Sequence, residues 1–278
     1  MDNNKNELKQ AVKKHWEDET CGIRYSENLN RKDFFNDISN KRYELEPYIK
    51  SFAEFDKASK KNILEIGVGA GSDFQNWCNY ANHATGIDLT EAAINLTDER
   101  LKLYSVDPHK YSIQVADSEE LPFENNSFDL VYSWGVLHHT PNTKRAFGET
   151  FRVLKPKGQL KAMIYHSPSW TLILLYLIHG LGKGKINISL KDIAFNFLES
   201  PGTKVYTLAE AKELLMERGF VNIKLTTKLG PGDLLTIKPS QKYNSSIYKL
   251  FMKIYPRWLV RLLGDRFGLY LLIDAYKP

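Results

Sequence analysis

The feature that most constrains the fold is an alternation of short apolar runs and helical patterns between residues 62 and 166. Short apolar runs bounded by turn residues predict buried strands, and apolar residues three or four positions apart predict helices. We expect strands at 62–67, 83–88, 111–116, 127–134 and 158–166, with helices at 72–81, 90–105 and 143–154. Because strands that alternate with helices form parallel sheets covered on both faces, the sequence predicts an α/β fold.

A cluster of glycines follows the first predicted strand, at Gly67, Gly69 and Gly71. Glycine costs conformational entropy on folding, so such a cluster needs a backbone reason, for example a tight turn that lies against a ligand. A turn between a strand and a helix is a common anion or nucleotide site. The spacing differs from the dinucleotide fingerprint G-x-G-x-x-G, because Ser72 stands where its last glycine would be. A nicotinamide dehydrogenase is therefore the least favoured enzyme class.

Four segments together resemble class I S-adenosylmethionine-dependent methyltransferases of the ubiquinone/menaquinone-methyltransferase-like (methyltransferase type 11) group. They are EIGVGAG at 65–71, TGIDLT at 85–90, VADSEELPFENNSFDLVYSWGVLHHTP at 115–141 and RVLKPKGQL at 152–160. The resemblance implies a Rossmann-like, mostly parallel seven-stranded sheet. It also implies the cofactor S-adenosyl-L-methionine and its product S-adenosyl-L-homocysteine.

The resemblance further implies a role for each site residue. Glu65 accepts a hydrogen bond from the cofactor's ammonium group, Asp88 from the two ribose hydroxyls, and Asp117 from the adenine amino group. The expected cofactor-binding residues are Glu65, Gly67, Gly69, Gly71, Asp88, Leu89, Asp117, Ser118 and Trp134. By themselves, Asp88 could be an ordinary acid at a helix N-terminus and Asp117 the cap of a short turn, and Trp134 could belong to the core.

Methyl transfer from a sulfonium is an in-line displacement with a neutral leaving group, so a base is needed only when the acceptor must lose a proton. His139 and His166 follow predicted strands, and we expect either to act as that base; the alternative is that they bond backbone groups. Tyr25, His138 and Tyr165 are the residues expected to line the substrate pocket, His138 with a mainly supporting role.

The sequence outside this alternating region predicts segments that cover the methyltransferase domain. Residues 1–58 form an N-terminal helical cap with helices at 5–16 and 41–55, and residues 59–278 form the methyltransferase domain. A capping box predicts a helix at 207–220, and strand 269–277 should run antiparallel beside strand 221–229. Insertions at about 167–206 and 230–267 should meet the N-terminal cap over the carboxyl edge of the sheet, where such sheets bind ligands.

Charge is uneven along the chain. The net charge is +5, and eight Lys or Arg against two acids lie between Lys238 and the C-terminus. Segment 245–264 has apolar residues at helical spacing beside a basic row. It is either a lid with a solvated basic face or a surface that touches an anionic membrane. Nucleic acid is not expected as a partner, because no basic-aromatic RNA motif is present.

The cysteines, the first residues and the length of the apolar runs indicate where the protein acts. Cys21 and Cys78 predict neither a disulfide framework nor a metal cluster. The polar first residues have no signal-peptide core and the longest apolar run is nine residues, so we expect a cytoplasmic enzyme. The acceptor is expected to be a small or lipid-like organic molecule. A catalytically silent cofactor-binding partner and an aminopropyl-type transferase are the alternatives, and neither the acceptor atom nor the oligomeric state follows from the sequence.

Overall fold

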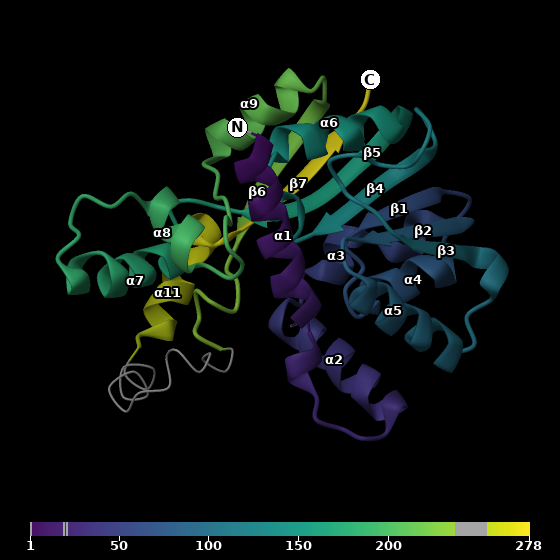
Figure 1. The fold of residues 1–278 in the computed structure, drawn as a ribbon, viewed down its shortest axis with the longest axis horizontal. Helices are drawn as coiled ribbons and strands as arrows, with labels where there is room; N and C mark the ends of the chain where they lie inside the picture. The colour runs from purple at the N-terminus through teal and green to yellow at the C-terminus, as the bar shows by residue number, and fades with distance from the viewer. Residues whose placement is uncertain (1, 19, 21, 237–254) are drawn as a thin grey trace.

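The computed structural model describes residues 2–18, 20, 22–236 and 255–278, and it contains one seven-stranded sheet (Figure 1). The strands are β1 (Asn62–Ile66), β2 (His83–Asp88), β3 (Tyr111–Val115), β4 (Phe128–Trp134), β5 (Leu154–Tyr165), β6 (Val221–Lys228) and β7 (Tyr270–Tyr276). Their order is β3-β2-β1-β4-β5-β7-β6. Strands β1 to β5 are parallel, and β7 is antiparallel to both neighbours. The predicted Rossmann-like sheet with an antiparallel last strand is confirmed.

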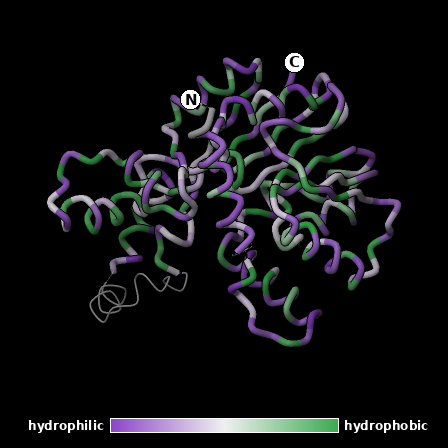
Figure 2. Tube along the Cα trace, viewed as in Figure 1, coloured by the Kyte–Doolittle hydropathy of each residue, from purple (hydrophilic) through white to green (hydrophobic). Residues whose placement is uncertain are grey.

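Two helical layers cover the sheet because successive side chains of a strand point to opposite faces. On one face, β1 places Ile63 against α4 (Ser72–Tyr80) and α5 (Glu91–Leu103). On the other, Leu64 packs with α6 (Thr143–Val153) and α9 (Leu208–Glu217). Figure 2 shows apolar residues concentrated in the strands between these layers.

Sequence-local signals set these helix boundaries. Thr90 caps α5 by accepting a hydrogen bond from the Ala93 backbone N–H, and Thr207 and Glu210 form the predicted capping box of α9. One boundary differs. Residues 155–157, which separate the expected helix 143–154 from the expected strand 158–166, lie within β5 (Leu154–Tyr165), where a register shift accommodates them opposite β4.

The N-terminal helices also differ from expectation. The predicted helix 41–55 is divided between α2 (Arg31–Leu45) and α3 (Ile49–Ala53). Pro47 lies between them, and a proline both lacks a backbone N–H and disfavours helical conformation in the residue before it. Helix α1 (Asp2–Asp18) precedes both and includes the predicted segment 5–16.

A helical lobe projects from the side of the sheet and consists of α7 (Trp170–His179), α8 (Leu190–Phe197) and α11 (Arg257–Leu263) (Figure 1). The first half of the predicted amphipathic segment 245–264 lies outside the described residues, since residues 237–254 are not among them. In the described part of the chain, no helix combines the length and the apolar character needed to cross a bilayer.

Candidate functional site

A cavity of about 550 Å³ lies at the carboxyl ends of the parallel strands and extends into the helical lobe. Residues from the N-terminal cap and from both predicted insertions line it together with the sheet edge. The lining includes Lys9, Trp16, Tyr25, Arg42, Glu46, Glu65, Gly67, Gly69, Asp88, Leu89, Asp117, Ser118, Trp134, His139, Tyr165, Leu174, Leu175, Ile178, Phe197, Leu198, Glu199, Leu235 and Leu269.

The glycine turn forms one wall of the cavity. Gly67, Gly69 and Gly71 have φ angles of 85°, 52° and 72°, a region that disfavours other residues. A Cβ at Gly67 would lie 2.2 Å from Val136 Cγ2, so the turn leaves no room for a side chain there. Gly71 is not among the described lining residues. It precedes α4, and a Cβ there would lie 3.0 Å from Thr97 Oγ1, so it allows α4 and α5 to pack closely.

Asp88 lies at the carboxyl end of β2 and is held by the turn next to it. Its Oδ2 accepts a hydrogen bond of 3.2 Å from the Gly69 N–H, and its Oδ1 accepts bonds from Thr90 N at 3.1 Å and Thr90 Oγ1 at 2.9 Å. Burial raises the pKa of Asp88, while these hydrogen bonds oppose the rise. Asp88 thus holds the glycine turn in place and also presents a hydrogen-bond acceptor to the cavity.

Glu65 is 3% exposed, and its Oε2 has no hydrogen-bond partner within the described chain. Burial and the negative charge of Asp73 raise the pKa of Glu65 well above its usual value, although Arg42 opposes the rise. A buried acceptor without a donor is costly, so this atom favours a ligand that brings a cationic or N–H group. The glycine cradle and this unpaired oxygen fit the ammonium end of S-adenosylmethionine.

Asp117 and Ser118 also line the cavity, beyond the end of β3. Asp117 Oδ2 forms an ion pair of 2.5 Å with Lys9 Nζ, and Lys9 also reaches Glu119 at 3.1 Å. Asp117 Oδ1 accepts from the Glu119 N–H. Sequence reasoning placed Asp117 at the site but missed that α1 supplies a cation to it, because no local pattern links residues so distant in the chain.

A buried polar network behind the glycine turn was not predicted. Arg42 binds both oxygens of Asp73, at 3.1 Å and 2.5 Å, and Tyr132 donates to the same carboxylate at 2.8 Å. Glu46, the C-cap residue of α2, accepts from Trp134 Nε1 at 3.0 Å. Arg42 and Glu46 have the i, i+4 spacing that brings two side chains together on one helix face. This spacing is the signal in the sequence that could have indicated the network.

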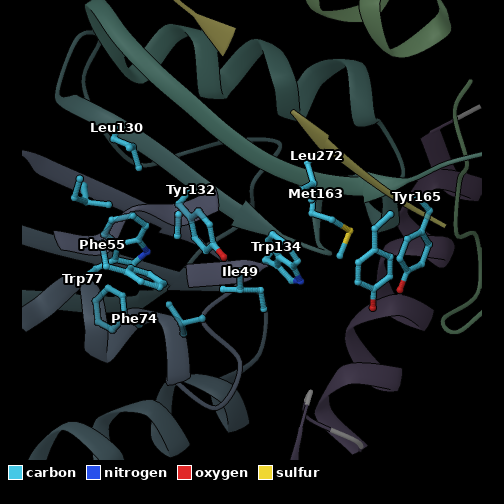
Figure 3. Packing of buried hydrophobic residues seen from close by; sticks show 14 of the residues in the cluster. Ile49, Phe55, Phe74, Trp77, Leu130, Tyr132, Trp134, Met163, Tyr165 and Leu272 are labelled. Atoms are coloured by element: carbon cyan, nitrogen blue, oxygen red, sulfur yellow. The ribbon is translucent and has the colours of Figure 1, made fainter. Parts of the chain in front are cut away.

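Trp134 is therefore held in the cavity wall by α2. Figure 3 shows Trp134, Met163 and Tyr165 side by side at the ends of β4 and β5, with Tyr132 deeper in the core. Tyr270 Oη also donates to Glu46, at 2.7 Å. These rings join the cofactor end of the cavity to the helical lobe.

The three candidate histidines have different surroundings. His138 is fully buried, neither ring nitrogen has a hydrogen-bond partner in the described chain, and burial lowers its pKa well below the usual value. His166 Nδ1 lies 3.1 Å from the Gly268 carbonyl oxygen. Neither is among the described lining residues, so His138 is placed outside the expected pocket and His166 is placed in a structural contact at the β5 end. His139 lines the cavity.

Hydrogen bonds fix the ring of His139. Its Nδ1 lies 2.8 Å from Ser200 Oγ and 3.1 Å from Thr203 Oγ1. Thr203 donates its own proton to the Ser200 carbonyl, so its oxygen can only accept, whereas the Ser200 hydroxyl can donate to Nδ1 or accept from it. Both contacts are made at Nδ1, and they hold the ring in place in either neutral tautomer.

Glu199 was missed by sequence reasoning and completes this cluster. Its Oε2 lies 3.5 Å from His139 Nε2 and accepts a hydrogen bond of 2.6 Å from Tyr165 Oη. Burial raises the pKa of Glu199, but the interactions with His139 and Tyr165 outweigh it and lower the pKa overall. The Glu199 carboxylate thus lies beside both His139 Nε2 and the Tyr165 hydroxyl. Trp16 packs edge-on against the same ring, with 5.5 Å between ring centroids.

Beyond Tyr165 the cavity is apolar. Leu174, Leu175 and Ile178 lie on one side of α7 and line it, as do Leu198 and Leu235. Tyr25, from the short helix η1 (Ile23–Tyr25), lines the cavity as well. The site therefore has a polar end at the glycine turn and an apolar end in the helical lobe.

Comparison with known proteins agrees with this geometry. Residues 64–162 match a family model described as a methyltransferase domain, of type 11. Phosphoethanolamine N-methyltransferase 2 of Caenorhabditis elegans is 29% identical over 177 residues, which cover 63% of this chain and 36% of the relative. Phthiotriol/phenolphthiotriol dimycocerosates methyltransferase of Mycobacterium leprae (strain TN) is 36% identical over 104 residues, which cover 37% of each chain. The matched segments thus span little more than a third of the length of these relatives.

Solved structures share the fold. Phosphoethanolamine N-methyltransferase 2 of Haemonchus contortus, in complex with S-adenosyl-L-methionine, matches with a TM-score of 0.57 and 20% identity, over 86% of this chain and 52% of that chain. At this identity the likeness shows the fold alone. Together with the family match, the sheet order and the glycine cradle, it leads to one conclusion: residues 64–162 belong to the type 11 group of class I S-adenosylmethionine-dependent methyltransferases, whose cofactor is S-adenosylmethionine.

Proposed function

We propose that this chain transfers a methyl group from S-adenosylmethionine to a bulky, largely apolar organic acceptor. The observation that carries the proposal is the single cavity, which joins the glycine turn to an apolar compartment built by α7 and the loop at 230–236. The relatives' names point to acceptors as different as phosphoethanolamine and phthiotriol dimycocerosates, so the names do not choose between polar and apolar acceptors. The lining of the compartment favours the apolar class.

In this proposal the polar end of the cavity holds the cofactor. Glu65 would accept a hydrogen bond from its ammonium group and Asp88 from the ribose hydroxyls. Asp117 would accept from the adenine amino group, which would replace Lys9 as its partner. The bound cofactor would supply an electrophilic methyl group on a sulfonium. Gly67 and Gly69 let the backbone lie close to the ligand, and Trp134, held by Glu46, closes the wall between the two ends of the cavity.

We assign the proton-accepting role to His139, with Glu199 as a positioning residue. Ser200 and Thr203 hold the ring at Nδ1, and Nε2 would be the nitrogen that takes up the proton. A proton taken from an acceptor hydroxyl or similar group would be stabilised by the Glu199 carboxylate. Methyl transfer itself needs alignment and exclusion of water, which the buried aromatic wall and the covering α1 provide.

Calorimetry with S-adenosylmethionine and S-adenosylhomocysteine tests the cofactor half of the proposal. Release of S-adenosylhomocysteine with a panel of hydroxylated apolar acceptors, beside polar amines of similar molecular weight, tests the acceptor half. We expect cofactor binding and turnover with apolar acceptors. Binding without turnover on any acceptor would favour a silent cofactor-binding protein, and turnover only with decarboxylated S-adenosylmethionine would favour an aminopropyl-type transferase.

A further inference from the structure

The helical lobe exposes several large apolar side chains to solvent. On α11, Trp258 is 69% and Leu262 is 74% exposed, one helical turn apart on the same face. Leu263 is 48% exposed, whereas Val260 is 2% exposed and points inward. A helix that buries one face and exposes another set of large apolar residues has an outer face suited to a partner.

A second exposed apolar segment lies in the same lobe. Leu177 near the end of α7 and Leu181 in the turn after it are each 48% exposed, and Ile186 is 63% exposed. Leu174, Leu175 and Ile178 of the same helix line the cavity instead. Helix α7 therefore separates the apolar compartment from an apolar outer surface.

The charged side chains around these residues are mostly basic. Lys183 and Lys185 follow α7, Arg261 and Arg266 belong to α11 and the turn after it, and all four are exposed. Residues 167–191 contain no Asp or Glu. Between 255 and 267 the single acid is Asp265, which pairs with Lys228 at 2.6 Å. Within the described residues these four cations form no ion pair with a carboxylate, and exposed aromatic and aliphatic residues together with such cations match an anionic lipid surface.

Both segments are tied to the loop at 230–236. Asp233 accepts from the Thr171 N–H at 2.9 Å, at the start of α7, and from the Leu269 N–H at 2.7 Å. Arg257, at the start of α11, donates to the Leu234 carbonyl at 2.9 Å. Helices α7 and α11, which carry the exposed apolar residues, are thus joined through one hydrogen-bonded loop.

We propose that the helical lobe, through Trp258 and Leu262 of α11 and the exposed end of α7, docks on an anionic membrane surface. Docking would bring the apolar compartment, whose wall is formed by α7, close to the lipid boundary, where an apolar acceptor resides. This last step rests on the proposed function, but docking itself does not depend on catalysis. A second copy of the chain, or residues 237–254 of this chain, could occupy the same face, and the test distinguishes them.

The test is flotation of the full chain, without cofactor, with vesicles of phosphatidylcholine alone or mixed with phosphatidylglycerol. We expect binding to the mixed vesicles at low ionic strength, weaker binding at high salt, and little binding to phosphatidylcholine alone. W258S/L262S should weaken binding about tenfold through lost apolar insertion. R261E/R266E should weaken it at least about tenfold on anionic vesicles, because two favourable charges become repulsive.

L29S/M216S provides the matched control, since Leu29 is 96% and Met216 is 59% exposed outside the lobe. This control should bind vesicles as the wild type does, and W258S/L262S should retain the wild-type unfolding temperature and affinity for S-adenosylmethionine. Equal binding by wild type and W258S/L262S, or no binding to anionic vesicles at low salt, would overturn the proposal. A dimer in sedimentation velocity that W258S/L262S dissociates, without vesicle binding, would assign the face to a second copy instead.

A further variant tests whether residues 237–254 cover the face. Deleting them while keeping a short linker should leave vesicle binding intact if the membrane is the partner. Vesicle binding that appears only after the deletion would show that this segment occupies the face in the full chain and would overturn the proposal. Vesicle binding by a chain that never binds S-adenosylmethionine would leave docking standing while refuting the proposed function.

Discussion

The methyltransferase core and the helical lobe are held together by different kinds of interaction. In the core, each element is marked by nearby residues, such as the Thr90 cap of α5 and the capping box of α9. In the lobe, buried Asp233 joins the Gly230 and Leu269 backbones to Thr171 across distant parts of the chain. The comparison teaches that the cofactor end can be recognised from local sequence, whereas the acceptor end depends on long-range contacts.

The largest expected effect is a loss of cofactor affinity, caused by a substitution within the methyltransferase core. Asp88→Asn should weaken S-adenosylmethionine binding about 100-fold, because hydrogen bonds to a charged group contribute roughly 1.5–3 kcal/mol each. Calorimetry measures this, and thermal unfolding checks that the glycine turn survives. Asp98→Asn, on the outer face of α5 in an ion pair with Lys102, is the control and should bind as the wild type does. Equal affinities for the two variants would remove Asp88 from the site.

The second effect concerns the boundary between the two regions. His139→Asn should reduce turnover about 100-fold, the usual scale of general-base catalysis, while cofactor affinity stays the same. The measurement is release of S-adenosylhomocysteine with any acceptor that the wild type accepts. His109→Asn replaces an exposed histidine outside the cavity and should retain full turnover. If His139→Asn turns over normally, the base is another group or none is used.

A smaller effect should be confined to the lobe. Leu175 lines the cavity, whereas Leu177 on the same helix is 48% exposed. Leu175→Asn should weaken binding of the apolar dye N-phenyl-1-naphthylamine about 30-fold, from roughly 2 kcal/mol of lost apolar burial. Fluorescence titration provides the measurement, and Leu177→Asn is the matched control. Similar losses in both variants would mean that the dye reports the outer surface and not the compartment.

The smallest expected effect is the release of a proton from Glu65 when the cofactor binds. Burial and Asp73 raise the pKa of Glu65, so the free chain favours the protonated acid, whereas a cationic ligand favours the carboxylate. Binding of S-adenosylmethionine should therefore release a proton, and affinity should rise with pH between the ligand-bound pKa of Glu65 and its raised pKa in the free chain. Calorimetry in buffers of different ionisation enthalpy measures the release, and Glu65→Gln should abolish it. A buffer-independent heat for the wild type would contradict this role.

Much of the core follows from the sequence. The predicted strands match β1 to β7 closely, because apolar runs and glycine or proline breaks act locally. Two predictions failed where local signals competed. Pro47 divides the expected helix 41–55. Residues 155–158 belong to β5 despite their turn composition, and Lys157 and Gly158 exchange backbone hydrogen bonds with Lys277, just after β7.

The sequence by itself determined the α/β sheet, the glycine turn and the acids near the carboxyl ends of β1 and β2, because these depend on backbone conformation and on neighbours in the chain. Only the tertiary structure decided which histidine faces the cavity, that Lys9 meets Asp117, and that Glu199 stands beside His139. Those contacts join residues between 60 and 110 positions apart. No periodicity or motif encodes such a distance, and packing of the caps over the sheet edge brings the groups together.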